Sequence, residues 1–238
     1  LPERGWGGGR RATALLRTLI ALGGSHVRAE KLCDALWSES DGDQARQNLK
    51  VALWRLKRIA GEGAEAVPWL HFQHGEVSLN ADVCEVDALC FQSAIRQAGD
   101  DPKRLWSALS AYSGDFLPYD KNGPAVDMRD RLRQLFVRST CLAAQASLLT
   151  GVPLRPEQIE LLRRTVSMQP DHALGYELLM SSHLKDHQPT EAIMVFHHAQ
   201  QGLQSFDGAS LSPELLRLRR LAVDSLGGTE RWGDAASA

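Results

Sequence analysis

The sequence predicts a mainly α-helical protein with a single β-hairpin among its helices. Most of the 238 residues follow the 3.6-residue hydrophobic period of amphipathic helices. The period changes to two only over residues 69–79, where Phe72, Val77 and Leu79 alternate with polar residues around His74-Gly75. Hydrophobic residues make up 43% and charged residues 24%, which is ordinary for a globular protein.

Three amphipathic helices are expected before the hairpin, over residues 12–22, 29–37 and 43–60. Gly23-Gly24 ends the first helix, Asp43 is the expected N-cap of the third, and Gly61 ends it. The apolar residues expected to face the core from the first two helices are Leu15, Leu16, Leu19, Ile20 and Leu22, then Leu32, Ala35 and Leu36. Three helices followed by a hairpin is the element order of a winged helix-turn-helix.

After the hairpin, almost the whole chain is helical by period. Helices are expected near residues 85–98, 101–113, 125–150, 156–168, 171–186, 188–205 and 212–226. Short links that contain Gly, Pro or Asp favour antiparallel neighbours. The packing positions of a tetratricopeptide repeat are matched by Tyr176, Leu179, Ala192, Phe196 and Ala199, although Met180 and His183 replace the repeat's Gly and Tyr.

These patterns divide the chain into three expected parts. A winged helix-turn-helix occupies residues 1–82, a tetratricopeptide-like all-α lobe occupies residues 83–226, and a flexible tail occupies residues 227–238. The charge is distributed unevenly along the chain. Residues 1–60 hold 11 Lys and Arg against 6 Asp and Glu, whereas the remainder holds 16 against 23. A basic lobe on an acidic body suggests that one end of the molecule meets a polyanion.

The third helix has one apolar face and one basic face. On a helical wheel its apolar residues fall along one line: Ala45, Leu49, Ala52, Leu53, Leu56, Ile59 and Ala60. The opposite side and its flanks carry Arg46, Gln47, Lys50, Val51, Trp54, Arg55, Lys57 and Arg58, and no acidic residue follows Asp43 in this helix. Lys and Arg neutralise phosphates, and Arg or Gln can pair with base edges in a major groove wide enough for one helix.

The third helix has two possible roles: it reads DNA, or its basic face is merely solvated and Trp54 packs against a neighbour. Its place as the third of three helices, directly before the hairpin, favours the DNA-reading role. We therefore expect groove contacts from Gln47, Lys50, Trp54, Arg55 and Arg58. We expect phosphate contacts from Arg46, Lys57 and Arg28, the last of which stands where the N–H groups of the second helix begin. His74 is expected to approach the duplex from the hairpin.

The same residues resemble the Streptomyces antibiotic regulatory protein (SARP) family. Leu15-Leu16, Ala35-Leu36-Trp37, Ala45-Arg46-Gln47-Asn48-Leu49 and Leu53-x-Arg55-Leu56-Lys57-Arg58 are similar to its winged-helix DNA-binding domain, and Val77-Ser78-Leu79-Asn80, Val86-Asp87-Ala88 and Phe91 to the exit from its wing. The adjoining bacterial transcriptional activator domain (BTAD) is resembled by Gly114-Asp115-Phe116-Leu117-Pro118, Arg129-x-x-Leu132, Leu178-Leu179-Met180 and Leu211-Ser212-Pro213-Glu214-Leu215. The likeness covers roughly residues 10–225.

The resemblance implies a cytoplasmic transcription activator that binds direct repeats in double-stranded DNA as side-by-side protomers and recruits RNA polymerase. It also implies that N-terminal strands are missing, because family members carry strands before the first helix, and that a further sensor or ATPase domain can be attached. The chain departs from the family at Tyr119-Asp120-Lys121-Asn122-Gly123-Pro124, which replaces an aromatic-rich segment.

Catalytic and metal-binding patterns are weak throughout. Gly7-Gly8-Gly9-Arg10-Arg11 lacks the Gly-Lys-Ser/Thr ending of a phosphate loop, so neither an enzyme nor a cofactor is expected. His183 and His187 lie one helical turn apart and are interpreted as a solvated helix end rather than a metal site. The four cysteines form no CxxC pair and are expected to be free thiols, and no apolar run is long enough to span a membrane. The alternative to DNA binding is a helical-repeat protein-interaction scaffold.

Overall fold

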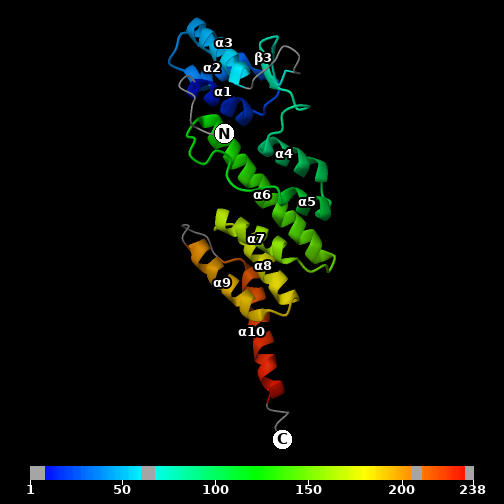
Figure 1. The fold of residues 1–238 in the computed structure, drawn as a ribbon. Helices are drawn as coiled ribbons and strands as arrows, with labels where there is room; N and C mark the ends of the chain where they lie inside the picture. The colour runs from blue at the N-terminus through cyan, green and yellow to red at the C-terminus, as the bar shows by residue number, and fades with distance from the viewer. Residues whose placement is uncertain (1–8, 60–67, 205–210, 234–238) are drawn as a thin grey trace. The chain divides into compact units, whose positions relative to one another are not determined.

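The computed structural model describes residues 9–59, 68–204 and 211–233 (Figure 1). The described chain is mainly helical, with a small antiparallel sheet in its N-terminal part, as the sequence predicts. Ala60 and Gly61, expected at the end of the third helix, lie outside the described residues. In the described part of the chain, no helix combines the length and the apolar character that a membrane crossing requires.

The chain divides into two compact units that do not follow its order in sequence. The first unit comprises residues 1–93 and 114–132, and the second comprises residues 94–113 and 133–238. The predicted boundary near residue 82 therefore stays a prediction, because the first unit also takes in a later segment.

The first unit is built on three helices: α1 (Arg10–Ala21), α2 (Ala29–Trp37) and α3 (Gly42–Ile59). The Ala45 N–H donates to the Asp41 carbonyl at 2.8 Å, so α3 is already helical before Asp43. The prediction that Asp43 is the N-cap is thus wrong by about two residues, and its carboxylate lies in the first turn, where it interacts favourably with the helix dipole.

A three-stranded antiparallel sheet completes this part, in the order β1-β3-β2. The predicted hairpin is β2 (Leu70–Gln73) and β3 (Glu76–Leu79), joined by His74 and Gly75. Both turn residues have positive φ, 51° and 78°, as a two-residue type I′ turn requires. β1 (Val27–Arg28) was not predicted, because two residues carry no detectable period.

The core of the first unit holds many of the expected residues, and Leu16, Ile20 and Leu22 are partly buried against it. The buried cluster includes Leu15, Leu19, Leu32, Leu49, Leu53, Leu56, Leu70, Val77 and Leu79. Ala35 and Leu36 are only half-buried, and Cys33 takes the buried place on α2 instead. Phe72 lies on the same sheet face as Leu70 but is 41% exposed, because it is near the turn end of an edge strand.

Two arginines, Arg129 and Arg131, organise the segment 114–132 of the first unit. Arg129 donates hydrogen bonds to the carbonyls of Phe116, Leu117 and Asp120, so it holds the loop that precedes α6 (Gly123–Leu149). Arg131 donates to the Ala21 carbonyl at the end of α1 at 3.0 Å. The two sequence motifs around Gly114 and Arg129 therefore act together: one forms a loop and the other fixes its backbone.

The second unit is helical throughout its described residues. Its helices include α5 (Pro102–Leu109), the second half of α6, α7 (Pro156–Met168), α8 (Ala173–Lys185), α9 (Pro189–Gln204) and α10 (Pro213–Gly233), and α4 (Asp87–Ala98) leads into it from the first unit. The expected repeat positions Tyr176, Leu179, Ala192, Phe196 and Ala199 are all buried, at most 4% exposed. α10 continues to Gly233, past residue 227, where the flexible tail was expected to begin.

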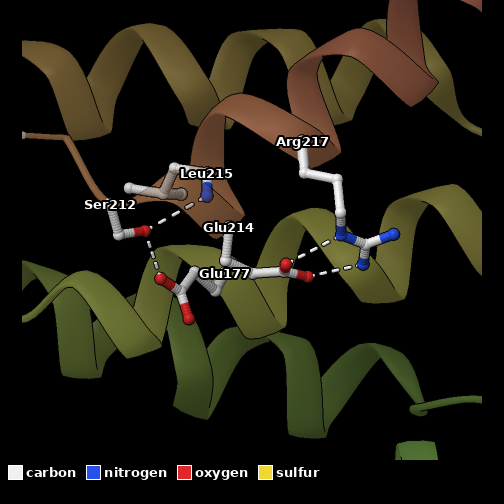
Figure 2. A network of polar contacts seen from close by, with 5 residues as sticks. All are labelled: Glu177, Ser212, Glu214, Leu215 and Arg217. Atoms are coloured by element: carbon white, nitrogen blue, oxygen red, sulfur yellow. Dashed lines mark hydrogen bonds and ion pairs between the residues drawn. The ribbon is translucent and has the colours of Figure 1, made fainter.

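Figure 2 shows how α10 begins. The Ser212 hydroxyl accepts the Leu215 N–H at 3.1 Å and donates to the Glu177 carboxylate on α8. Ser212 is therefore an N-cap that also fixes the helix to its neighbour, and Pro213 occupies the first helical position, where no N–H is needed. Arg217 donates to both carboxylate oxygens of Glu214, and this hydrogen bond lowers the pKa of Glu214.

Candidate nucleic-acid interface

α3 separates an apolar face from a polar one, as its sequence predicts. Ala45, Leu49, Ala52, Leu53 and Leu56 are each at most 5% exposed and belong to the core of the first unit. The side chain of Ile59 lies outside the described residues. The packing of this face against α1 and α2 fixes the rotation of α3, so that the opposite face points to solvent.

The solvent face carries most of the residues expected to contact DNA. Arg46, Gln47, Lys50, Trp54, Arg55 and Arg58 are all exposed, whereas Lys57 is half-buried at the edge of the face. Trp54 is 57% exposed, so the alternative in which it packs into a neighbouring element does not fit the structure. A large, exposed apolar ring among cations is expensive to leave in water unless it meets a partner.

Trp54 and Arg58 form one composite surface. The Arg58 guanidinium lies over the Trp54 ring, 4.7 Å from its centroid. The two residues are four apart on the helix and therefore project side by side. A cation–π contact at an exposed site is worth about 0.5–1 kcal/mol, which is enough to bias both side chains toward this arrangement. The pair presents a flat, positively charged plate.

Arg46 has a carboxylate partner one turn earlier on α3. Its guanidinium lies 3.7 Å from the Asp43 carboxylate, and both side chains are exposed. Exposed ion pairs are worth about 0–1 kcal/mol. A phosphate group can therefore displace Asp43 at little cost, so this pair does not remove Arg46 from a DNA-contacting role.

Arg28 and His74 are brought together at the hairpin rather than on α3. Arg28 pairs with Glu76 across β1 and β3, and the Ala29 N–H donates to the Gly75 carbonyl at 2.8 Å. Both Arg28 and His74 are exposed. Because β1 was missed, the sequence could not show that Arg28 stands beside the turn of the wing as well as at the start of α2.

The wing also holds a pair that the sequence did not indicate. His26 Nδ1 lies 3.0 Å from the Glu76 carboxylate, and the His26 backbone has a φ of 53°. His26 and Glu76 are distant in sequence, and only the β1–β3 pairing brings them together. The carboxylate makes this edge of the hairpin less basic than α3.

Other chemistry is sparse in the described residues. No group of three or more His, Cys, Asp or Glu side chains there is placed to hold a metal ion. His183 is 2% exposed and its Nδ1 lies 3.0 Å from Gln188 Oε1, so the prediction of a solvated helix end is wrong for this residue. His187 is exposed in the turn after α8. All four cysteines are free, as expected.

The fold is that of a winged helix followed by an all-α lobe, which is the class that the sequence predicts. A solved structure with this fold is Mycobacterium tuberculosis EmbR in complex with a low-affinity phosphopeptide. EmbR is a SARP-family regulator with a winged-helix DNA-binding domain and a BTAD. The two chains superpose with a TM-score of 0.60 at 18% sequence identity, over 90% of this chain and 59% of the EmbR chain.

This likeness establishes the fold, and the chain spans 59% of the length of the EmbR chain. No protein-family model matches the sequence, and no curated protein matches it.

Proposed function

We propose that this chain is a non-enzymatic transcription regulator that binds specific sites in double-stranded DNA by placing α3 in the major groove. The observation that carries the proposal is the solvent face of α3, which presents Lys50, Trp54 and Arg58 and has no carboxylate after Asp43. A protein-interaction scaffold gains nothing from such a face, whereas a polyanion binder needs it.

The individual roles follow from side-chain chemistry. Gln47, Lys50, Arg55 and Arg58 can offer hydrogen-bond donors to base edges, and Trp54 can pack on a sugar or a thymine methyl group. Arg46, Lys57 and Arg28 are assigned to phosphates, which position the protein without reading sequence. His74, at the exposed tip of the hairpin, is assigned to the neighbouring backbone or minor groove.

The finer proposal is an activator. The resemblance to the SARP family and the shared fold with EmbR support binding to direct repeats as side-by-side protomers, with the helical lobe contacting RNA polymerase. The same support extends to a cytoplasmic location and to a further sensor or ATPase domain in the full-length protein.

The direct test is the fluorescence anisotropy of labelled duplex DNA at about 50 and 200 mM salt. If roughly four phosphates are contacted, affinity should fall on the order of 100-fold between these concentrations, because bound cations release condensed counterions. Binding that is absent at the lower salt would contradict the proposal and favour the scaffold alternative.

A charge reversal on α3 sharpens the test. Lys50→Glu should weaken binding at every DNA sequence and lower the salt dependence, because it removes a cation and adds a repelled anion. The matched control is Lys103→Glu, which makes the same charge change at an exposed position in the first turn of α5. The proposal requires loss of affinity by at least about tenfold for Lys50→Glu, with the control near the wild-type value. Equal affinities for the two variants would remove Lys50 from the interface.

A further inference from the structure

α10 presents a second unpartnered surface, far along the chain from α3. Its inner side packs through Leu215, Leu218 and Ala222, which are at most 3% exposed, against α8 and α9. Its outer side exposes Leu216 by 39% and Val223 by 50%. In Figure 1 the last turns of α10 extend beyond the ends of α8 and α9. Two large aliphatic side chains one heptad apart form a stripe that folding within one chain does not use.

A shallow groove of about 410 Å³ lies along this stripe. It is lined by Leu216, Arg219, Arg220, Val223 and Asp224. Arg219 is engaged within the chain, because its guanidinium lies over the Phe196 ring, 5.2 Å from the centroid. Gly227 continues the stripe with an exposed position that has open space around it. The order Leu216, Arg220, Val223, Gly227 has the four-three-four spacing of a helix-pairing seam.

Two opposite charges flank the groove without neutralising each other. Among the described residues, neither Arg220 nor Asp224 has an ion-pair partner, and Arg220 makes only a 3.5 Å contact with the Leu216 carbonyl. They are four residues apart with the cation first, which is the less favourable order for a pair within one helix. Both charges are therefore available to another chain.

We propose that this face of α10 pairs with the same face of a second copy of the chain, with the two helices antiparallel about a two-fold axis beside residues 221 and 222. In this register Leu216 packs over Gly227 of the second copy, and Arg220 meets Asp224 of the second copy. The two-fold axis repeats each contact, as an isologous interface requires. A second copy is the occupant that fits, because the surface carries both members of its own ion pair and matches a large residue with a glycine.

Sedimentation equilibrium of the full chain without DNA tests the pairing. The wild-type protein should be a dimer that weakens as salt is added. Arg220→Glu should raise the dissociation constant by about tenfold or more, since it opposes two carboxylates on each side of the two-fold axis. Asp224→Arg should have the same effect. The combination of both substitutions exchanges the charges and should restore a dissociation constant close to the wild-type value.

The outcomes separate the proposal from its rivals. A monomer at about 100 μM wild-type protein overturns it, since a helix-pair interface that weak would have no role. A dimer that survives Arg220→Glu unchanged assigns pairing to another surface and also overturns it. Failure of the double variant to recover, with circular dichroism showing an intact fold, would exclude the Arg220–Asp224 contact.

This inference does not depend on DNA binding. The dimer is measured in the absence of DNA, and the α3 variants of the proposed function leave α10 untouched. An Arg220→Glu variant that is monomeric and still binds DNA that carries one repeat would therefore support the α10 pairing and the DNA-binding role of α3 independently.

Discussion

Trp54 and Arg58, one turn apart on α3, form an exposed surface that is suited to binding a partner. The indole is 57% exposed, and the Arg58 guanidinium lies over its face, so the surface combines an apolar ring with a positive charge. Neither side chain adds to the core of the first unit. An exposed placement of both side chains is what the proposed contact with DNA requires.

The cysteines Cys90 and Cys141 are expected to differ in reactivity because they differ in burial. Cys141 is 3% exposed and burial raises its pKa to about 11, so at pH 8 only about one thiol in 10³ is ionised. Cys90 is exposed. Brief treatment of the folded protein with iodoacetamide, followed by peptide mass spectrometry, should modify Cys90 and leave Cys141 intact. In denaturant both should react, and equal labelling of the two in the folded protein would contradict the described burial.

Single residues also mark the limit of prediction from sequence. The buried positions of α3 follow from the 3.6-residue period alone, because one amphipathic helix has one way to bury its stripe. Phe72 has the correct face by its two-residue period but is exposed, since the period does not reveal where the core ends. The burial of His183 depends on Gln188 and on the packing of neighbouring helices, which no local pattern encodes.

At the scale of elements, the Ser212 cap at the start of α10 should make a measurable contribution to the free energy of unfolding. Ser212→Ala removes the acceptor for the Leu215 N–H and the donor to Glu177, so the free energy of unfolding should fall by about 1 kcal/mol or somewhat more. Urea denaturation followed by circular dichroism measures this change.

The matched control for the cap lies on the same helix. Ser225 is exposed and its hydroxyl donates to the Leu221 carbonyl within α10. Ser225→Ala should leave stability nearly unchanged or raise it slightly, because alanine has the higher helix propensity. A loss of similar size in both variants would mean that Ser212 has no special capping role.

Elements differ in how well the sequence marks them. α2 and α7 have the predicted bounds, since Trp37 is followed by a polar break and Pro156 starts a helix. β1 escaped prediction because it exists only through pairing with β3, a contact between distant residues. That omission matters for the candidate site, as β1 is what places Arg28 beside the wing.

At the scale of the whole molecule, the two units share helices. α4 runs from the first unit into the second across residues 93 and 94, and α6 does so across residues 132 and 133. When one unit unfolds, its part of α4 and α6 unfolds as well. The part of each helix in the other unit then loses the backbone hydrogen bonds that crossed the boundary. We expect the units to unfold together.

Two probes with different weights test this coupling. Trp37, Trp54 and Trp69 belong to the first unit, and Trp106 and Trp232 belong to the second, so fluorescence gives more weight to the first unit. Far-UV circular dichroism is dominated by helices, many of which belong to the second unit. The urea midpoints by the two probes should coincide. Well-separated midpoints would show that the shared helices do not couple the units.

The contacts of Arg129 and Arg131 affect the order in which the first unit folds during synthesis. Synthesis proceeds from the N-terminus, so α1, α2, α3 and the hairpin leave the ribosome well before the segment 114–132. The contact from Arg131 to the end of α1 and the loop that Arg129 fixes cannot form until that segment has emerged. During synthesis, the first unit therefore cannot be completed until residues 114–132, which follow the winged helix in sequence, have been translated.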